Sequence, residues 1–494
     1  MPAPLTVEER VAPATVTTPD RPRWHTIAPA VALSVLVALV HFRPWQGGML
    51  EDWTTSVAWD IEGMGGLAER MPLMMGRPLH LIPHYLGLVL SDGGFVGMYV
   101  VLAAVAVAQL LGAAWAVHAI IASPMLRWAL ALVVALHPWW AAGSLLRFLS
   151  AQVAVLGLVL WLGAAVRLLR GGSRSLVWLM VLAPTLGLLT YQAPAGVLVV
   201  GSMLLVCRLD ASTRRRWVTV GATTAVSAGV MAWSALIAPR LTPEAYEGEL
   251  LTNGLDVIAS VRSILRTIAL HAPTLAFMLI AVAALVVALG FRQAITPRIG
   301  WLLLAGVAAA PLTALVYAGQ PLHLHDPERV ALPAGLTAWL VLICALAGTQ
   351  IAPRWERALA TIVILSTASG ALAGYLTWTR FASAQQSLLD VVQPIRATTP
   401  TDHQLVIADR TGRFGDTYLL IPPHLTLALL EQSGPGVEAS ICTPSDVVRD
   451  HPIATRLPIA TTPTCSELLP PDTTPVATVD TDLGLVDVYA IPAT

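Results

Sequence analysis

The sequence predicts an all-α polytopic membrane bundle of about eleven transmembrane helices, followed by a small extracytoplasmic α+β domain at the C-terminus. Of the 494 residues, 56% are hydrophobic and 12% are charged, whereas a soluble domain carries roughly 25% charged residues. The apolar residues form repeated long runs, and a helix needs about 20 apolar residues to cross a bilayer. After residue 378 the composition changes sharply, and Pro, Thr and Asp become frequent.

This composition excludes several classes of protein. A mean hydropathy of +0.69 leaves too little polar surface for a cytosolic enzyme or a secreted globule of this length. The 29 basic and 30 acidic residues give a net charge of -1, so no basic stripe is available for nucleic acid. The bilayer is therefore the first expected partner of the chain.

The first predicted span covers residues 26–42 and follows a polar leader, residues 1–25, which contains Arg10, Arg21 and Arg23. No small-residue cleavage pattern follows it, so we expect an uncleaved first helix and not a signal peptide. Ten further apolar runs lie at residues 94–121, 128–145, 149–166, 176–190, 193–207, 218–238, 270–291, 299–318, 331–349 and 358–378.

Arginine predicts the orientation, because cytoplasmic loops are enriched in basic residues. With a cytoplasmic N-terminus, the basic short loops all fall on the inside, as in 167–174 and 208–216. Residues 43–93 then form a long first outer loop, and the tail after residue 378 also lies outside. Residues 176–207 allow one long tilted helix as an alternative, but a turn at Tyr191-Gln192 keeps the pattern of basic loops consistent. We therefore expect a multi-pass protein of the plasma membrane.

The tail, residues 379–494, reads as a small α+β domain. Residues 403–410 predict a strand, residues 425–432 a short helix, and residues 476–479 and 485–491 a hairpin. Cys442 and Cys465 both fall in this tail, where an extracytoplasmic compartment permits a disulfide, with two free thiols as the alternative.

Few ionisable residues fall in the middle of the predicted spans, which argues against a proton pump or an ion-coupled transporter. Polar residues gather instead at the predicted outer helix ends. Glu51 and Asp52 follow the first span, and Gly76-Arg77-Pro78-Leu79-His80 follows in the same loop. A late outer loop contains His323, His325 and Asp326, with Arg329 directly before another span.

A first span, a long outer loop with an acidic pair and a G-R-P-L segment resemble the GT-C class of integral-membrane glycosyltransferases. Within that class the chain is most similar to glucosyltransferases that modify surface polysaccharide and use a polyprenyl-phosphate sugar. Tyr191-Gln192 at an outer turn and Arg329 before a late span fit the same resemblance, which covers residues 26–378 by architecture.

The resemblance implies a sugar donor linked through phosphate to a long isoprenoid, and an envelope glycan or lipid acceptor. In an inverting transfer a carboxylate takes the proton of the acceptor hydroxyl, and we assign this role to Asp52 with Glu51 as its helper, or the reverse. Arg77 and Arg329 would stabilise the departing phosphate. Further candidates for contacting the substrate or its phosphate are His80, Arg147, Tyr191, Gln192, His323 and His325.

Several alternatives remain open from the sequence. Glu51 and Asp52 could hold a divalent cation, Mg²⁺ or Mn²⁺, or could only cap a helix. Arg77 could anchor the chain at the interface, and Arg329 could pair with a neighbouring acid. Other functions are a polymer ligase that uses a lipid-diphosphate donor, a transporter or flippase, and a membrane anchor that presents the tail.

Overall fold

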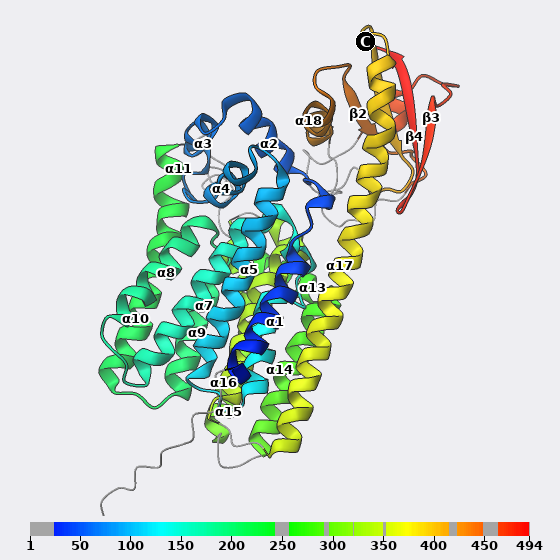
Figure 1. Cartoon of the computed structure of the whole chain (residues 1–494). Helices are drawn as coiled ribbons and strands as arrows, with labels where there is room; N and C mark the ends of the chain where they lie inside the picture. Colours follow the sequence, from blue (N-terminus) through cyan, green and yellow to red (C-terminus); the bar gives the residue numbers. More distant parts are fainter. Residues whose placement is uncertain are drawn as a thin grey trace, which may run out of the picture.

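The computed structural model describes residues 24–242, 256–290, 296–319, 321–348, 352–413, 422–447 and 463–493. The predicted leader, apart from Trp24 and His25, and residues 243–255, between the predicted spans 218–238 and 270–291, lie outside this part of the chain. The remainder forms a helical bundle with a small sheet domain at one end (Figure 1).

Seven of the described helices are long and apolar enough to cross a membrane. They are α1 (Trp24–His41), α5 (Phe95–His118), α7 (Leu149–Leu169), α10 (Thr213–Ala232), α14 (Ala272–Gly290), α16 (Pro327–Leu346) and α17 (Pro353–Thr398). An eighth span results if α15 (Pro297–Ala309) and η7 (Pro311–Tyr317), which meet at a bend of 41°, are counted together. The chain therefore has the length and composition of a multi-span membrane protein, as predicted.

The prediction of eleven spans is wrong. All eleven apolar runs contain helix, but α6 (Pro124–Leu136), α8 (Leu176–Thr190) and α9 (Pro194–Arg208) have only 13, 15 and 15 residues. At 1.5 Å per residue such helices rise about 20–22 Å, which is less than the bilayer core of about 30 Å. An apolar run indicates that a segment avoids water, but it does not distinguish burial in lipid from burial in protein. The middle of α6 is buried inside the bundle.

The chain reverses between α8 and α9, as the sequence predicts. Tyr191–Ala193 separates the two helices. The end of α8 lies beside the first outer loop, where the His80 ring contacts the Thr190 carbonyl. The end of α9 lies at the other end of the bundle, where Arg208 donates to the carbonyl of Cys344. This hairpin packs against α7, and a Cβ on Gly157 of α7 would lie 2.6 Å from the Ala183 carbonyl oxygen. Small residues permit such close helix contact.

Short helices cover the end of the bundle that faces the sheet domain (Figure 1). The first outer loop folds into η1 (Pro44–Gln46), α2 (Glu51–Glu62), α3 (Gly65–Arg70), η2 (Pro72–Met74) and α4 (Ile82–Ser91). Other connecting elements are η3 (Ala141–Ser144), η4 (Leu146–Phe148), η5 (Trp233–Ile237), α11 (Ala238–Leu241), α13 (Val257–Leu270) and η8 (Pro321–His325).

Helix α17, of 46 residues, runs along the bundle and continues into the C-terminal domain (Figure 1). The predicted boundary at residues 378–379 falls inside this helix. Apolar residues of its last third, including Leu388 and Val392, belong to the same hydrophobic core as the sheet. The helix therefore joins the two parts as one continuous element.

The predicted elements of the tail are confirmed. The sheet has the order β2-β1-β4-β3, with β1 (His403–Asp409), β2 (Ala439–Cys442), β3 (Ala477–Thr481) and β4 (Gly484–Pro492). Helix α18 (Pro422–Ser433) connects the parallel strands β1 and β2, and β3 and β4 form the antiparallel hairpin. The sequence reading missed β2. Cys442 and Cys465, the latter at the start of α19 (Cys465–Leu468), form the predicted disulfide, while Cys207 and Cys344 are free.

The C-terminal domain packs directly on α2. Trp53 of α2 belongs to the core of that domain, and the Ser56 hydroxyl donates to Glu431 of α18 at 2.6 Å. Within the domain, the Arg396 guanidinium donates to the carbonyls of Leu429, Gly434 and Val437. The start of α2 is therefore held between the bundle and the sheet domain.

Candidate functional site

A cavity of about 550 Å³ lies at this end of the bundle, between α2, η2, α4, η4 and the start of α16. Seven residues proposed from the sequence line it: Glu51, Asp52, Arg77, His80, Arg147, Tyr191 and Arg329. These residues are spread over almost 280 positions of the chain, and the structure brings them to one cavity.

The two acidic residues occupy the first turn of α2. Leu50, before the helix, has a φ of 49°, and the Asp52 carboxylate accepts a hydrogen bond from the Met49 N–H at 3.0 Å. Acidic side chains are favoured at a helix N-terminus. Asp52 therefore binds the N–H of Met49, the residue ahead of the N-cap Leu50, and at the same time lines the cavity.

The two carboxylates have different environments. Asp52 is 2% exposed, and burial raises its pKa from 3.8 to about 7, against the opposing effect of the Met49 N–H. The Glu51 side chain is 58% exposed and lies 3.2 Å from the Arg147 guanidinium. Desolvation in the cavity wall raises the pKa of Glu51, but Arg147 and other neighbours outweigh it and the net pKa is lowered. Near neutral pH, Asp52 can therefore exchange a proton while Glu51 stays charged.

Three arginines from distant elements face the same cavity. Arg77 is buried in the turn after η2, Arg147 lies in η4 with a 7% exposed side chain, and Arg329 lies in the first turn of α16. Arg329 also pairs with Asp326 at 3.2 Å, as one sequence alternative proposed. Asp326 caps α16 by accepting hydrogen bonds from the N–H groups of Glu328 and Arg329, which fixes the start of that helix. The arrangement suits an anion that accepts several guanidinium hydrogen bonds.

His80 and His84 tie the loop to the bundle. His80 Nδ1 lies 3.1 Å from the Thr190 carbonyl oxygen, and His84 Nε2 lies 3.0 Å from that of Leu146. Burial and the charge of Arg77 place the pKa of His80 well below its usual value, so His80 is neutral near pH 7. Both rings line the cavity as neutral polar groups.

Tyr191 and Gln192 lie differently relative to the cavity. Tyr191 lines the cavity, and its hydroxyl accepts a hydrogen bond from the Tyr317 hydroxyl at 3.0 Å. Gln192 is not among the cavity residues. Its amide donates to the Gly76 carbonyl at 3.0 Å, next to Arg77. Gln192 therefore positions the loop that carries Arg77, and its contact with a substrate stays a prediction.

The structure places His323 and His325, on η8, outside the set of cavity residues. The His323 ring packs edge-on against Tyr317, with ring centroids 6.1 Å apart. Burial and the charges of Arg329, Arg77 and Arg147 put the pKa of His323 well below its usual value. His323 is therefore a neutral group close to the arginine cluster. That His323 and His325 contact a phosphate directly stays a prediction.

A divalent cation does not fit the donor set around Glu51 and Asp52. The described residues contain no group of three or more His, Cys, Asp or Glu side chains that could hold a metal ion. Glu51 is already paired with Arg147, Asp52 is bound to the Met49 N–H, and guanidiniums line the same cavity. The charge of this wall favours an anion.

Sequence reasoning missed part of the cavity. Arg70, which lies 3.7 Å from Glu62, and His84 are polar lining residues. Leu73, Met74, Leu81 and Phe148 supply an apolar wall. The first outer loop contains most of these residues, so its unusual content of Met and Leu between charged positions was the available signal. No protein-family model, curated protein or solved structure was found to match this chain.

The raised pKa of Asp52 predicts the sign of one pH effect on stability. The folded protein keeps a proton on Asp52 between pH 3.8 and about 7, where the unfolded chain has lost it. The free energy of unfolding therefore falls as the pH rises through this window, and Asp52→Asn removes that fall. Thermal unfolding of the detergent-purified protein at about pH 5 and about pH 8 measures the effect.

Glu51→Gln is the matched control, because the lowered pKa of Glu51 contributes stability that is present above its unfolded value of 4.5 and lost at lower pH. We expect Asn at position 52 to be tolerated better at about pH 8 than at about pH 5, whereas the cost of Gln at position 51 should be the same at both pH values, since both lie above 4.5. An Asp52→Asn variant that is destabilised equally at both pH values would contradict the assignment.

Proposed function

We propose that the chain is a membrane glycosyltransferase that moves a sugar from a polyprenyl-phosphate donor to an envelope glycan or lipid acceptor on the outer face. One observation carries the proposal: a buried carboxylate with a pKa near 7 and three guanidiniums line the same cavity at one end of a membrane bundle. The proposal rests on the geometry of the site, because a fold alone does not identify a function.

Asp52 acts as the general base. The acceptor hydroxyl oxygen attacks the anomeric carbon and forms the new glycosidic bond, and its proton passes to the Asp52 carboxylate. The bond between the anomeric carbon and the phosphate oxygen breaks, and its electron pair leaves with the lipid phosphate, so the configuration inverts. A base with a pKa near the working pH combines a sufficient ionised fraction with a sufficient affinity for the proton.

The arginines stabilise the leaving group. Arg77, Arg147 and Arg329 supply planar hydrogen-bond donors for the charge that develops on the phosphate. Glu51 orients Arg147 through their 3.2 Å ion pair and keeps one arginine at the side of the base. A ground-state phosphodiester carries less charge than the departing monoester, so these contacts strengthen as the bond breaks.

The apolar wall of Leu73, Met74, Leu81 and Phe148 suits a substrate with a lipid tail. The cavity also has a neighbour in the C-terminal domain, His424 of α18. Burial lowers the pKa of His424, and its ring lies close enough to Glu51 and Arg147 for their charges to affect that pKa as well. We assign the acceptor to the side of the cavity next to α18, since the C-terminal domain covers that side.

The first test is transfer by the purified protein with a lipid-linked sugar. We expect Asp52→Asn to lower kcat by about 10²- to 10⁴-fold, the usual contribution of a general base. In the wild type, kcat should rise with pH through about 7, following ionisation of Asp52. Asp92→Asn is the control, since Asp92 is an exposed residue at the end of α4 with a left-handed backbone that Asn tolerates.

Transfer at the wild-type rate by Asp52→Asn would remove this mechanism. A variant set in which Arg329 substitutions abolish activity while Asp52→Asn retains it would favour the ligase that acts on a lipid diphosphate.

The orientation is tested separately, by labelling cysteines with a membrane-impermeant maleimide in a Cys207→Ala background. Thr474→Cys lies on the exposed surface of the C-terminal domain, and Arg174→Cys lies in an exposed loop at the opposite end of the bundle. We expect Thr474→Cys to react in intact cells and Arg174→Cys to react only after permeabilisation. The reverse pattern would place the cavity in the cytosol and exclude an outer-face transfer.

A further inference from the structure

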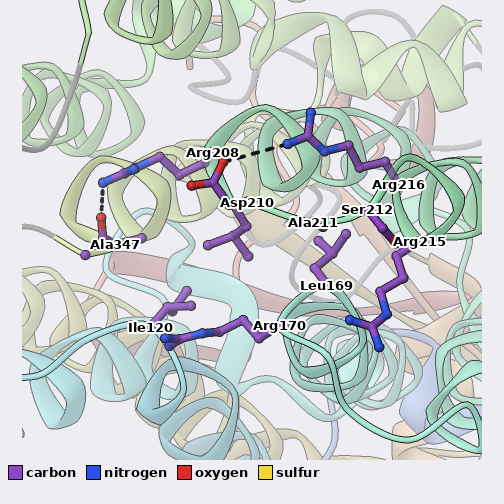
Figure 2. A pocket seen from close by; sticks show the side chains of 12 residues that line it. Ile120, Leu169, Arg170, Arg208, Asp210, Ala211, Ser212, Arg215, Arg216 and Ala347 are labelled. Carbon is purple, nitrogen blue, oxygen red and sulfur yellow. Dashed lines mark hydrogen bonds and ion pairs between the residues drawn. The ribbon is translucent and has the colours of Figure 1, made fainter. Parts of the chain in front are cut away.

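A second cavity, of about 640 Å³, lies at the end of the bundle opposite the candidate site. Figure 2 shows the side chains of Arg170, Arg208, Arg215 and Arg216 around it, together with Asp210. These residues come from the end of α7, the end of α9 and the first turn of α10, three elements that pack against each other. None of them takes part in the proposed sugar transfer.

The cavity carries an excess of positive charge. Four guanidiniums line it against a single carboxylate, that of Asp210. Asp210 lies 3.9 Å from Arg216, and both side chains are exposed, so their pairing is weak. Arg208 is held in place because it donates to the carbonyls of Cys344 and Ala347. Its charge is therefore fixed beside the cavity, where Asp210 is the acidic neighbour.

The start of α10 adds to this positive field. Ser212 is the N-cap residue but its side chain makes no capping hydrogen bond, and the first turn contains no acidic residue. Arg214, Arg215 and Arg216 stand there instead. Cations at a helix N-terminus are unfavourable, because the helix dipole already places positive charge there. An anion seated in the cavity would stabilise both the guanidiniums and the helix end.

Exposed tryptophans place the cavity at the level of lipid head groups. Trp178, Trp217, Trp301 and Trp355 are all exposed. Each stands within the first five residues of a helix (α8, α10, α15 and α17) that begins at this end of the bundle. Tryptophan gathers at membrane–water interfaces, so the four side chains mark the boundary of the bilayer. Apolar Ile120 and Leu169 form part of the cavity wall at the same depth.

From these observations we infer that the cavity binds the phosphate of an anionic phospholipid head group. Arg170, at the end of α7, and Arg215, on α10, both line it and supply planar donors for the phosphate. The adjoining apolar wall accommodates the glycerol and the first methylenes of the acyl chains. A basic cavity between helices at a membrane interface is a favourable site for such lipids. This inference does not depend on the proposed function.

The test uses the full chain, purified in detergent, with native mass spectrometry to measure lipid affinity. Phosphatidylglycerol should bind about tenfold or more tightly than phosphatidylcholine. The Arg170→Gln/Arg215→Gln double variant should lose about tenfold or more in phosphatidylglycerol affinity, the effect of one charge-assisted bond or more. Arg214→Gln is the matched control, since Arg214 is an exposed residue of the same helical turn and does not line the cavity.

Inorganic phosphate, added as a competitor, distinguishes a lipid from a free anion. We expect it to displace phosphatidylglycerol only at much higher concentration, because it lacks the apolar contacts. Equal affinity for the two lipids, an equal loss in Arg214→Gln, or displacement by phosphate at the same concentration as the lipid would overturn the inference. Each of these results leaves the Asp52 activity test unaffected, so the two proposals fail independently.

Discussion

The burial of one carboxylate beside several guanidiniums, at the start of α2, is the constraint on which the candidate site depends. Asp52 is almost fully removed from solvent and holds the Met49 N–H, while its neighbour Glu51 pairs with Arg147. Taking a carboxylate out of water costs free energy, and the protein tolerates it because the charged form is partly replaced by the protonated one. That compensation also makes the group able to accept a proton at neutral pH.

The position of α2 comes from both parts of the molecule. The bundle holds its N-terminal turn through Arg147, and the C-terminal domain holds its other face through Trp53 and Ser56. Helix α17 runs without interruption from the bundle into that domain. The two ends of the bundle also differ: one combines acids with arginines around a cavity, and the other presents arginines near exposed tryptophans.

Much of this arrangement was predictable because a membrane bundle has only two ends. Glu51, Arg77 and Arg329 each lie in a predicted outer loop, so residues hundreds of positions apart were expected at the same face. Local pattern also predicted β1, α18 and the hairpin. The pairing of Glu51 with Arg147 was not predictable, since it depends on how η4 folds over the end of α7. The contact of Gln192 with the Gly76 carbonyl was not predictable either, because a polar residue at a turn has the same sequence pattern whether it binds a ligand or a neighbouring carbonyl.

The predicted number of spans was wrong for a different reason. Residues 124–136 and 176–208 are as apolar as a lipid-facing helix, but part of their surface is covered by protein, and hydropathy does not separate the two environments. Helix α17 continues past the predicted domain boundary, through Pro394 to Thr398, and apolar residues after position 378 pack with the sheet.

A structure of the full chain in lipid nanodiscs with a bound polyprenyl phosphate would show where the phosphate binds. We expect it within hydrogen-bonding distance of at least two of the guanidiniums of Arg77, Arg147 and Arg329, on the side of the cavity next to Asp52. A phosphate bound outside this cavity, with the three arginines still facing an empty space, would contradict this expectation.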